Sequence, residues 1–266
     1  MKKKVLKTLA LLIAISLIVG ICWFANALCG NPVSKFLAER AADAYLEEHF
    51  PDTDYYIKEV GFNFKDTNYY AHVRSDSSID TQFSLYINLF GKVYWDTYES
   101  MLNGSITASR LYQEYRALTD QIFESPSFKY KSDIQFGSLE IYPQEAIDDP
   151  MVTDIPDYAI VQQDLILDHI YDIRKLGRQA GRLVIYVDNE ELTFENAAKI
   201  LLYIRAEFDK ANIPFRAIDF RMRTDEEYIH FDNFLYEDIY EEGLVDRIAA
   251  AHAELEAYYA EQDALK

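Results

Sequence analysis

The longest apolar stretch of the chain runs from Thr8 to Leu28 and carries no charged side chain. A helix over it, at about 1.5 Å per residue, would be roughly 31 Å long, which matches the ~30 Å hydrocarbon core of a bilayer. Four lysines precede it, and the first acidic residue is Glu39. By the positive-inside rule, this pattern predicts a single-pass anchor over residues 1–30, with a cytoplasmic amino terminus and the remaining chain outside the cell membrane.

Two alternatives to an uncleaved anchor stay open. The stretch Ala25–Ala27 fits a small-x-small cleavage site of a signal peptide. Against cleavage, the apolar run is longer than the usual signal-peptide core, and Trp23 suits a membrane interface. Lipidation at Cys22 or Cys29 is the other alternative, but the residues before each cysteine make poor lipoprotein signals.

After the anchor, apolar residues first recur at the spacing of a helix and then alternate with polar residues as in strands. A helix is predicted from Asn31-Pro32 to about His49, because asparagine and proline favour the start of a helix. Alternating apolar residues then predict four strands, and the first two form a hairpin with Phe64 opposite Tyr69. A helix from about Ile106 to Phe123 completes the order α-β-β-β-β-α, a helix-and-meander pattern similar to cystatin and PepSY modules.

The second half of the chain mixes both periodicities. A helix is predicted from about Gln163 to Gly181, and Leu183–Val187 predicts a strand buried on both faces. The order is β-α-β-α-β-β-α, so the whole chain is predicted to be α+β, with a meander domain and a second, mixed-sheet domain. We expect four segments: the anchor at 1–30, an N-terminal domain at 31–125, a linker at 126–133 and a C-terminal domain at 134–266.

Several segments of the chain resemble the YfjL-like family, in both its N-terminal and its C-terminal domain. They are Asn31-Pro32-Val33-Ser34-Lys35, Asn63-Phe64-Lys65-Asp66, Gly91-Lys92-Val93, Asp96-Thr97-Tyr98-Glu99, Tyr171-Asp172-Ile173, Ile218-Asp219-Phe220 and Phe234-Leu235-Tyr236-Glu237-Asp238-Ile239-Tyr240-Glu241-Glu242-Gly243-Leu244. The resemblance covers nearly all of the chain after the anchor. It implies a membrane-anchored surface protein of Gram-positive bacteria, and it brings no catalytic residues.

Charge and cysteine content exclude several classes of function. The formal net charge is −19, and without the four leading lysines 22 basic side chains face 45 acidic ones, a net charge near −23. Such a surface repels phosphate backbones, so nucleic acid is excluded as a partner. No cysteine follows Cys29, which leaves the exported part without disulfides, thiol catalysis or cysteine zinc sites.

Motifs for enzyme chemistry are also missing from the sequence. We find no Gly-x-Ser-x-Gly, no glycine-rich phosphate loop and no His-Glu-x-x-His, and the five histidines show no ligand-pair spacing. Accordingly we assign no catalytic residue, no cofactor and no metal ligand. Asp164, Asp168 and Asp172 repeat every four residues, and we interpret them as a solvated helix face rather than as a cation site.

Two groups of residues are candidates for binding. Tyr70, His72 and Tyr86 fall on the polar face of the first sheet, where aromatic side chains can form a recognition patch. More often such a face is covered by the domain's own helix or by a neighbouring domain.

In the second domain, His230 and Asp232 share one strand face, with Arg221 predicted opposite His230. These residues could orient an anion or perform acid–base chemistry. The simpler interpretation is a polar patch across two strands, because a spacing of two residues arises easily by chance.

The leading hypothesis is therefore a non-catalytic, membrane-anchored extracytoplasmic protein that binds a protein or peptide partner through its first sheet. The alternative is a cell-envelope hydrolase or transferase of unrecognised type, centred on His230, Asp232 and Arg221. A third possibility is a cation-dependent adhesin or sensor that uses the acidic surface.

Overall fold

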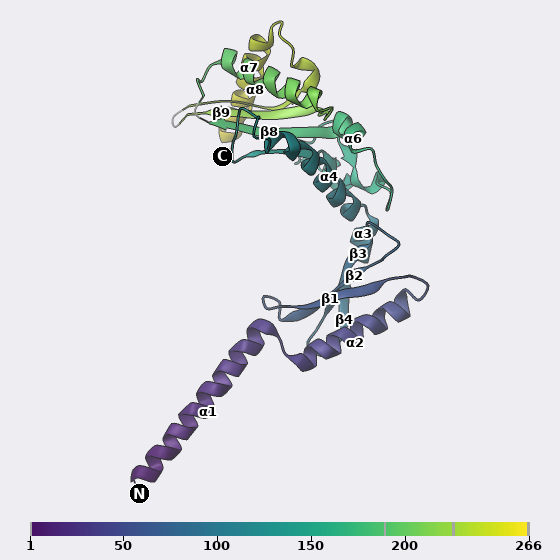
Figure 1. The fold of residues 1–266 in the computed structure, drawn as a ribbon, viewed down its shortest axis with the longest axis vertical. Helices are drawn as coiled ribbons and strands as arrows, with labels where there is room; N and C mark the ends of the chain where they lie inside the picture. Colours follow the sequence, from purple (N-terminus) through teal and green to yellow (C-terminus); the bar gives the residue numbers. More distant parts are fainter. Residues whose placement is uncertain (1, 189, 225–226, 265–266) are drawn as a thin grey trace. The chain divides into compact units, whose positions relative to one another are not determined.

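The computed structural model describes residues 2–188, 190–224 and 227–264, and it confirms the predicted α+β class. The chain divides into two compact units, an N-terminal unit at Met1–Ile106 and a C-terminal unit at Thr107–Lys266 (Figure 1). Each unit has its own four-stranded sheet.

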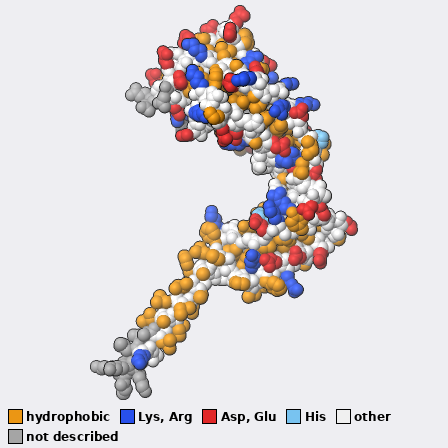
Figure 2. Space-filling model, in the orientation of Figure 1, with side chains coloured by type: hydrophobic (Ala, Val, Ile, Leu, Met, Phe, Trp, Pro, Cys, Tyr) orange, Lys and Arg blue, Asp and Glu red, His pale blue; other side chains and the backbone are white. Residues whose placement is uncertain are grey.

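The first helix, α1 (Lys2–Cys29), contains the apolar stretch. Among the described residues it supplies the one stretch that is long and apolar enough to cross a membrane, with a mean hydropathy of 2.4, and none of that stretch is buried within the chain. Figure 2 shows a nearly unbroken hydrophobic surface along α1, where Trp23 is 71% exposed. These are the properties of a membrane-spanning segment, and a signal sequence has them too.

The junction after α1 is short and tightly held. Gly30 has a φ of +71°, and α2 (Pro32–His49) begins two residues later. The side chain of Asn31 caps α2 by accepting a hydrogen bond from the Ser34 amide at 2.8 Å. The hydroxyl of Tyr69 accepts a bond from the Asn31 amide and donates one to the Asn31 carbonyl, both at 3.0 Å. The start of α2 is thereby fixed to the sheet.

The N-terminal sheet is an antiparallel meander in the order β1-β2-β3-β4, as the alternating pattern predicts. One face packs against α2, whose small residues Ala38 and Ala42 are fully buried and let the helix approach closely. The strands are β1 (Tyr56–Asn63), β2 (Asn68–Arg74), β3 (Gln82–Ile87) and β4 (Val93–Asp96), and the short helix α3 (Tyr98–Leu102) follows.

The register of the first hairpin differs from the prediction. Phe62, not Phe64, lies opposite Tyr69, because the turn occupies residues 64–67. Phe64 is 55% exposed in this turn, and Thr67 takes a φ of +55° there. The turn lies one residue earlier than predicted, so the pairing of the two strands shifts by two residues in all. Because side chains alternate with a period of two, the apolar residues still share one face. In this register Glu59 pairs with His72.

The helix predicted to close the first domain packs in the C-terminal unit instead. In α4 (Ser105–Phe123), Leu111 and Tyr115 are fully buried beside Leu139 and Leu176 of that unit. The hydroxyl of Tyr115 donates a 2.9 Å hydrogen bond to the Pro214 carbonyl. The compact units therefore divide near residue 106, and not at the predicted linker.

The C-terminal sheet has the order β10-β9-β8-β5 and is mixed, because β8 and β9 run parallel while the other pairs are antiparallel. Side chains of β8 alternate between buried and half-buried, so the prediction of a strand buried on both faces is wrong. The core face packs against α7 through Leu201, Ile204 and Phe208. The elements are β5 (Gln135–Leu139), β8 (Gly181–Asp188), α7 (Phe194–Lys210), β9 (Ala217–Arg223), β10 (Tyr228–Leu235), η2 (Tyr236–Asp238) and α8 (Leu244–Ala264).

The segment between β5 and β8 contradicts the predicted long helix. Its helical part is only α6 (Ile173–Ala180), which begins where the Asp172 side chain accepts hydrogen bonds from the amides of Arg174 and Lys175. Asp168 has a φ of +62°, which breaks any helix through it. The interpretation of Asp164, Asp168 and Asp172 as one helix face is therefore wrong. The remaining elements are β6 (Ile141–Tyr142), α5 (Gln144–Ile147), β7 (Ile160–Val161) and η1 (Gln162–Asp164).

Candidate functional site

Aromatic side chains form a row across the open face of the N-terminal sheet. Tyr70 on β2 pairs with Tyr86 on β3, and Tyr86 pairs with Trp95 on β4. The rings of Tyr86 and Trp95 lie 4.8 Å apart between centroids. Trp95 is 55% exposed. The structure thus brings the predicted Tyr70 and Tyr86 together and adds Trp95. We call Tyr70, Tyr86 and Trp95 the aromatic row.

A glycine on the edge strand β1 makes room for the Tyr70 ring of this row. Gly61 pairs with Tyr70, and a Cβ at Gly61 would lie 2.3 Å from the Tyr70 ring atom Cζ. The ring therefore covers the bare backbone of the edge strand. Glycine in a strand often marks such a close approach of another group to the backbone.

His72, the third predicted residue of this face, lies beside the aromatic row. Its ring centroid is 4.8 Å from that of Tyr70, and its Nδ1 is 2.8 Å from the Ser84 hydroxyl. Its Nε2 lies 3.7 Å from a Glu59 carboxylate oxygen. A shallow groove of 420 Å³ runs past His72 and is also lined by Lys58, Arg74 and Gln82. Charged and polar side chains thus lie on the same sheet face, next to the aromatic row.

The second predicted group also converges. His230 pairs with Arg221 across β10 and β9, as predicted, and both line a small hollow of 110 Å³ together with Asp232. The Arg221 guanidinium carbon lies 5.6 Å from the ring centre of Tyr186 and 5.0 Å from that of Tyr228. The Arg221 guanidinium thus makes cation–π interactions with both tyrosine rings.

Burial shifts the titration of two groups in this hollow. Desolvation lowers the pKa of His230 below its ordinary value, against the opposing effect of the Glu256 carboxylate. Desolvation also raises the pKa of Asp232, and the neighbouring Asp219 carboxylate raises it further. Both shifts favour the neutral forms.

A network of ion pairs fixes the neighbouring part of this sheet face. The Arg182 guanidinium donates to an Asp219 carboxylate oxygen from Nε at 2.8 Å and lies 3.3 Å from Glu140 through Nη1. The other Asp219 oxygen accepts a 2.9 Å bond from the Asn233 amide, at the bulge where Asn233 takes a φ of +53°. All these charges have partners, so this network is structural.

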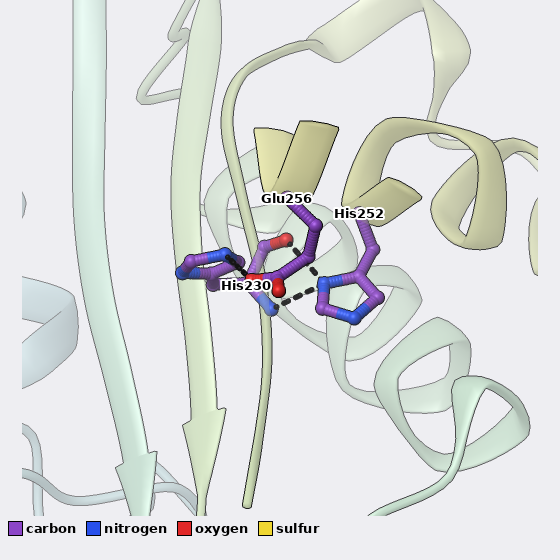
Figure 3. Close-up of side chains that lie close together, drawn as sticks. All are labelled: His230, His252 and Glu256. Atoms are coloured by element: carbon purple, nitrogen blue, oxygen red, sulfur yellow. Dashed lines mark hydrogen bonds and ion pairs between the residues drawn. The ribbon is translucent and has the colours of Figure 1, made fainter. Parts of the chain in front are cut away.

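Sequence reasoning missed two residues that contact His230. His252 and Glu256 reach it from α8, as Figure 3 shows, with the Glu256 carboxylate 2.8 Å from His230 Nε2. His252 Nδ1 lies 3.1 Å from the backbone oxygen of His230. The spacing of four between His252 and Glu256 places both on one helix face, and this was the available signal.

The fold and these surfaces define an α+β protein of two compact units behind an apolar N-terminal helix, with polar and aromatic sheet faces. The chain belongs to the YfjL-like family: the YfjL-like N-terminal domain matches residues 2–97 and the YfjL-like C-terminal domain matches residues 114–249. The second match begins inside α4, in agreement with the packing of that helix in the C-terminal unit. No curated protein and no solved structure matches the chain.

Proposed function

We propose that this chain is a non-catalytic binding protein that α1 holds in the cell membrane, with the amino terminus in the cytoplasm and both compact units outside. It binds a protein or peptide partner through the open face of the N-terminal sheet. The observation that supports this proposal is the aromatic row, which presents Trp95 at 55% exposure beside a charged groove. Exposed tyrosine and tryptophan side chains contribute the largest share of binding energy at many protein interfaces.

The arrangement of the unit supports the same surface. Helix α2 packs on the opposite face of the sheet, where Ala71 and Leu85 are fully buried. Helix α4, which we expected to close this domain, has its buried residues in the C-terminal unit. Within the N-terminal unit, the row of Tyr70, Tyr86 and Trp95 is therefore left partly exposed.

We prefer binding to the alternative of an envelope hydrolase centred on Arg221, His230 and Asp232. The hollow that these residues line is 110 Å³. Sites for small-molecule ligands usually measure about 300–1,000 Å³. The carboxylate nearest to His230 is Glu256, at 2.8 Å, in place of the expected Asp232.

The test places a photo-reactive amino acid at Gln82, which lies on the open face opposite Arg74. Cells that make the full chain are irradiated, and adducts of the chain are resolved by mass. We expect a discrete adduct with the wild-type surface and its loss when Tyr70, His72 and Tyr86 are all changed to alanine. These side chains are partly exposed, so the variant should keep its fold, which circular dichroism verifies.

The matched control is Phe90→Ala, which removes an exposed aromatic side chain from a turn of the same unit. This variant should form the adduct as the wild type does. An adduct of equal yield in the triple-alanine variant, or none with the wild type, contradicts the proposed surface.

A further inference from the structure

Three side chains with metal-ligating atoms meet at the outer edge of β10. His230 comes from this strand, and His252 and Glu256 come from α8 (Figure 3). One ligating atom from each residue lies within 4.8 Å of those of the other two. Because β10 is the edge strand of its sheet, α8 lies directly against it, and His252 Nδ1 approaches the His230 backbone nitrogen at 3.4 Å. The group thus joins helix and strand.

The contact between His230 and Glu256 has the distance of an ion pair but not the geometry of a hydrogen bond. His230 is 7% exposed, and its Nε2 lies 2.8 Å from a Glu256 oxygen. Yet, within the described part of the chain, this buried Nε2 has no hydrogen-bond partner. The carboxylate therefore lies off the direction in which Nε2 forms bonds. A metal ion placed in that direction would give the His230 Nε2 atom a bonding partner, and a Glu256 oxygen could bind the same ion.

The donor set and spacing suit a first-row divalent ion. Two imidazole nitrogens and one carboxylate are a frequent ligand set for zinc, with bonds of about 2.0–2.2 Å. Tetrahedral geometry with such bonds places ligand atoms about 3.3 Å apart. Here His230 Nε2 lies 2.8 Å from a Glu256 oxygen, and all three ligating atoms lie within 4.8 Å of one another. Glu256, whose side chain is 45% exposed, has the freedom to adjust, while burial holds His230 in place.

The surroundings leave room for a further ligand. A groove of 440 Å³ is lined by His252 and Glu256 and also by Tyr228 and Glu227. Three protein ligands leave the fourth tetrahedral position free, and the groove gives water or a carboxylate access to it. Arg221, one of the positive groups on this sheet face, lies over the rings of Tyr186 and Tyr228 and lines the same hollow as Asp232.

We infer that His230, His252 and Glu256 form a binding site for one zinc-class divalent ion, with an open position toward the groove. The site does not depend on the binding surface of the N-terminal sheet. The competing arrangement is an ion pair of His230 with Glu256, in which His252 Nδ1 stays hydrogen-bonded to the His230 backbone. The two arrangements differ in whether the chain holds a metal ion.

The test uses the full chain in detergent, purified without a polyhistidine tag and stripped with a chelator. Bound zinc is measured by elemental analysis after equilibrium dialysis against ZnCl₂. We expect one ion per chain and a thermal midpoint that rises with zinc concentration, since a ligand that binds only the folded state stabilises it. Both His252→Gln and Glu256→Gln should weaken zinc binding by about tenfold or more.

Two substitutions serve as matched controls. Glu254→Gln removes an exposed carboxylate from the same helix, and His169→Gln removes an exposed histidine elsewhere in the unit. Both should leave zinc binding unchanged. Because His252 and Glu256 are less buried than His230, their variants test the site without removing a core side chain. Absence of bound zinc in the wild type, or equal binding in either ligand variant, overturns the inference.

Discussion

At the scale of single residues, Asp54 shows how one carboxylate connects two loops of the N-terminal unit. Its oxygens accept a 2.6 Å bond from the Ser75 hydroxyl and a 2.9 Å bond from the Ser77 amide, more than twenty residues along the chain. These bonds lower the pKa of Asp54 below 3.8, and the bond from Ser75 contributes most. They fasten the start of β1 to the end of β2.

The change Ser75→Ala should raise the pKa of Asp54 toward its ordinary value. Because the folded-state pKa is the lower one, the carboxylate stabilises the fold above pH 3.8, and this contribution disappears as the pH falls through the folded-state pKa. The substitution should reduce that pH dependence. The measurement is the NMR titration of the Asp54 side chain; Ser77→Ala, which keeps the Ser77 amide, should have a smaller effect. If the Ser75→Ala variant shows the same Asp54 pKa as the wild type, this explanation is wrong.

Residue patterns predicted part of each candidate site. The period of two places Tyr70 and Tyr86 on one face, and the hairpin pattern places His230 opposite Arg221, because both depend on neighbours within a sheet. His252 and Glu256 escaped notice because their approach to His230 depends on how α8 packs beside β10. The four-residue spacing places His252 and Glu256 on one helix face, but it does not indicate that this face meets His230.

At the scale of elements, turns and caps explain the errors. Phe64 fits a strand pattern, but the turn at residues 64–67 includes it, and the side chain is 55% exposed. Asp172 fits a helical repeat, but its side chain caps α6 and so starts the helix. Phe64 is compatible with a strand or a turn, and Asp172 with a helix interior or a helix cap. In each case tertiary contacts decide which of the two structures forms.

The position of α4 depends on a close approach to β5 that can be tested. A Cβ at Gly137 would lie 2.4 Å from the Thr119 methyl group, and the Gly137 amide donates a 3.1 Å bond to the Thr119 hydroxyl. Gly137→Ala should therefore destabilise the protein by about 1–3 kcal/mol through overpacking. Thermal or urea unfolding of the full chain measures this change.

The control for this prediction is Ser138→Ala on the neighbouring, half-buried position of β5. It should change the free energy of unfolding much less. The double variant Gly137→Ala/Thr119→Ala should lose less stability than the two single changes added together, because Thr119 is the obstacle. Strict additivity would show that α4 does not press on β5 at this point.

At the scale of the whole molecule, charge and hydrophobicity separate along the chain. The N-terminal helix carries the hydrophobic surface, while acidic and basic side chains are spread over the surface that follows it (Figure 2). This separation was visible in the sequence, because length, composition and charge need no tertiary contact. The division of the chain near residue 106 was not, because it depends on where α4 packs.

The proposed topology makes a direct prediction. Alkaline phosphatase fused behind Lys266 should be active, because that enzyme folds only outside the cytoplasm, and the fusion should remain with the membranes after an alkaline wash. The intact mass should include residues 1–30 if α1 is an uncleaved anchor. An inactive fusion would refute export, and a chain shortened near Ala27 would identify a signal peptide instead.

The two-residue junction between α1 and α2 limits how far the protein can reach. From Cys29 to Pro32 the backbone covers three steps of about 3.8 Å, or about 11 Å at full extension, and the Tyr69 hydroxyl bonds hold Asn31 within that distance. If α1 is embedded in lipid, as we propose, the N-terminal unit has no stalk and would lie at the headgroup layer. Under the proposed topology, a partner of this unit would therefore have to reach a surface that lies next to the lipid headgroups.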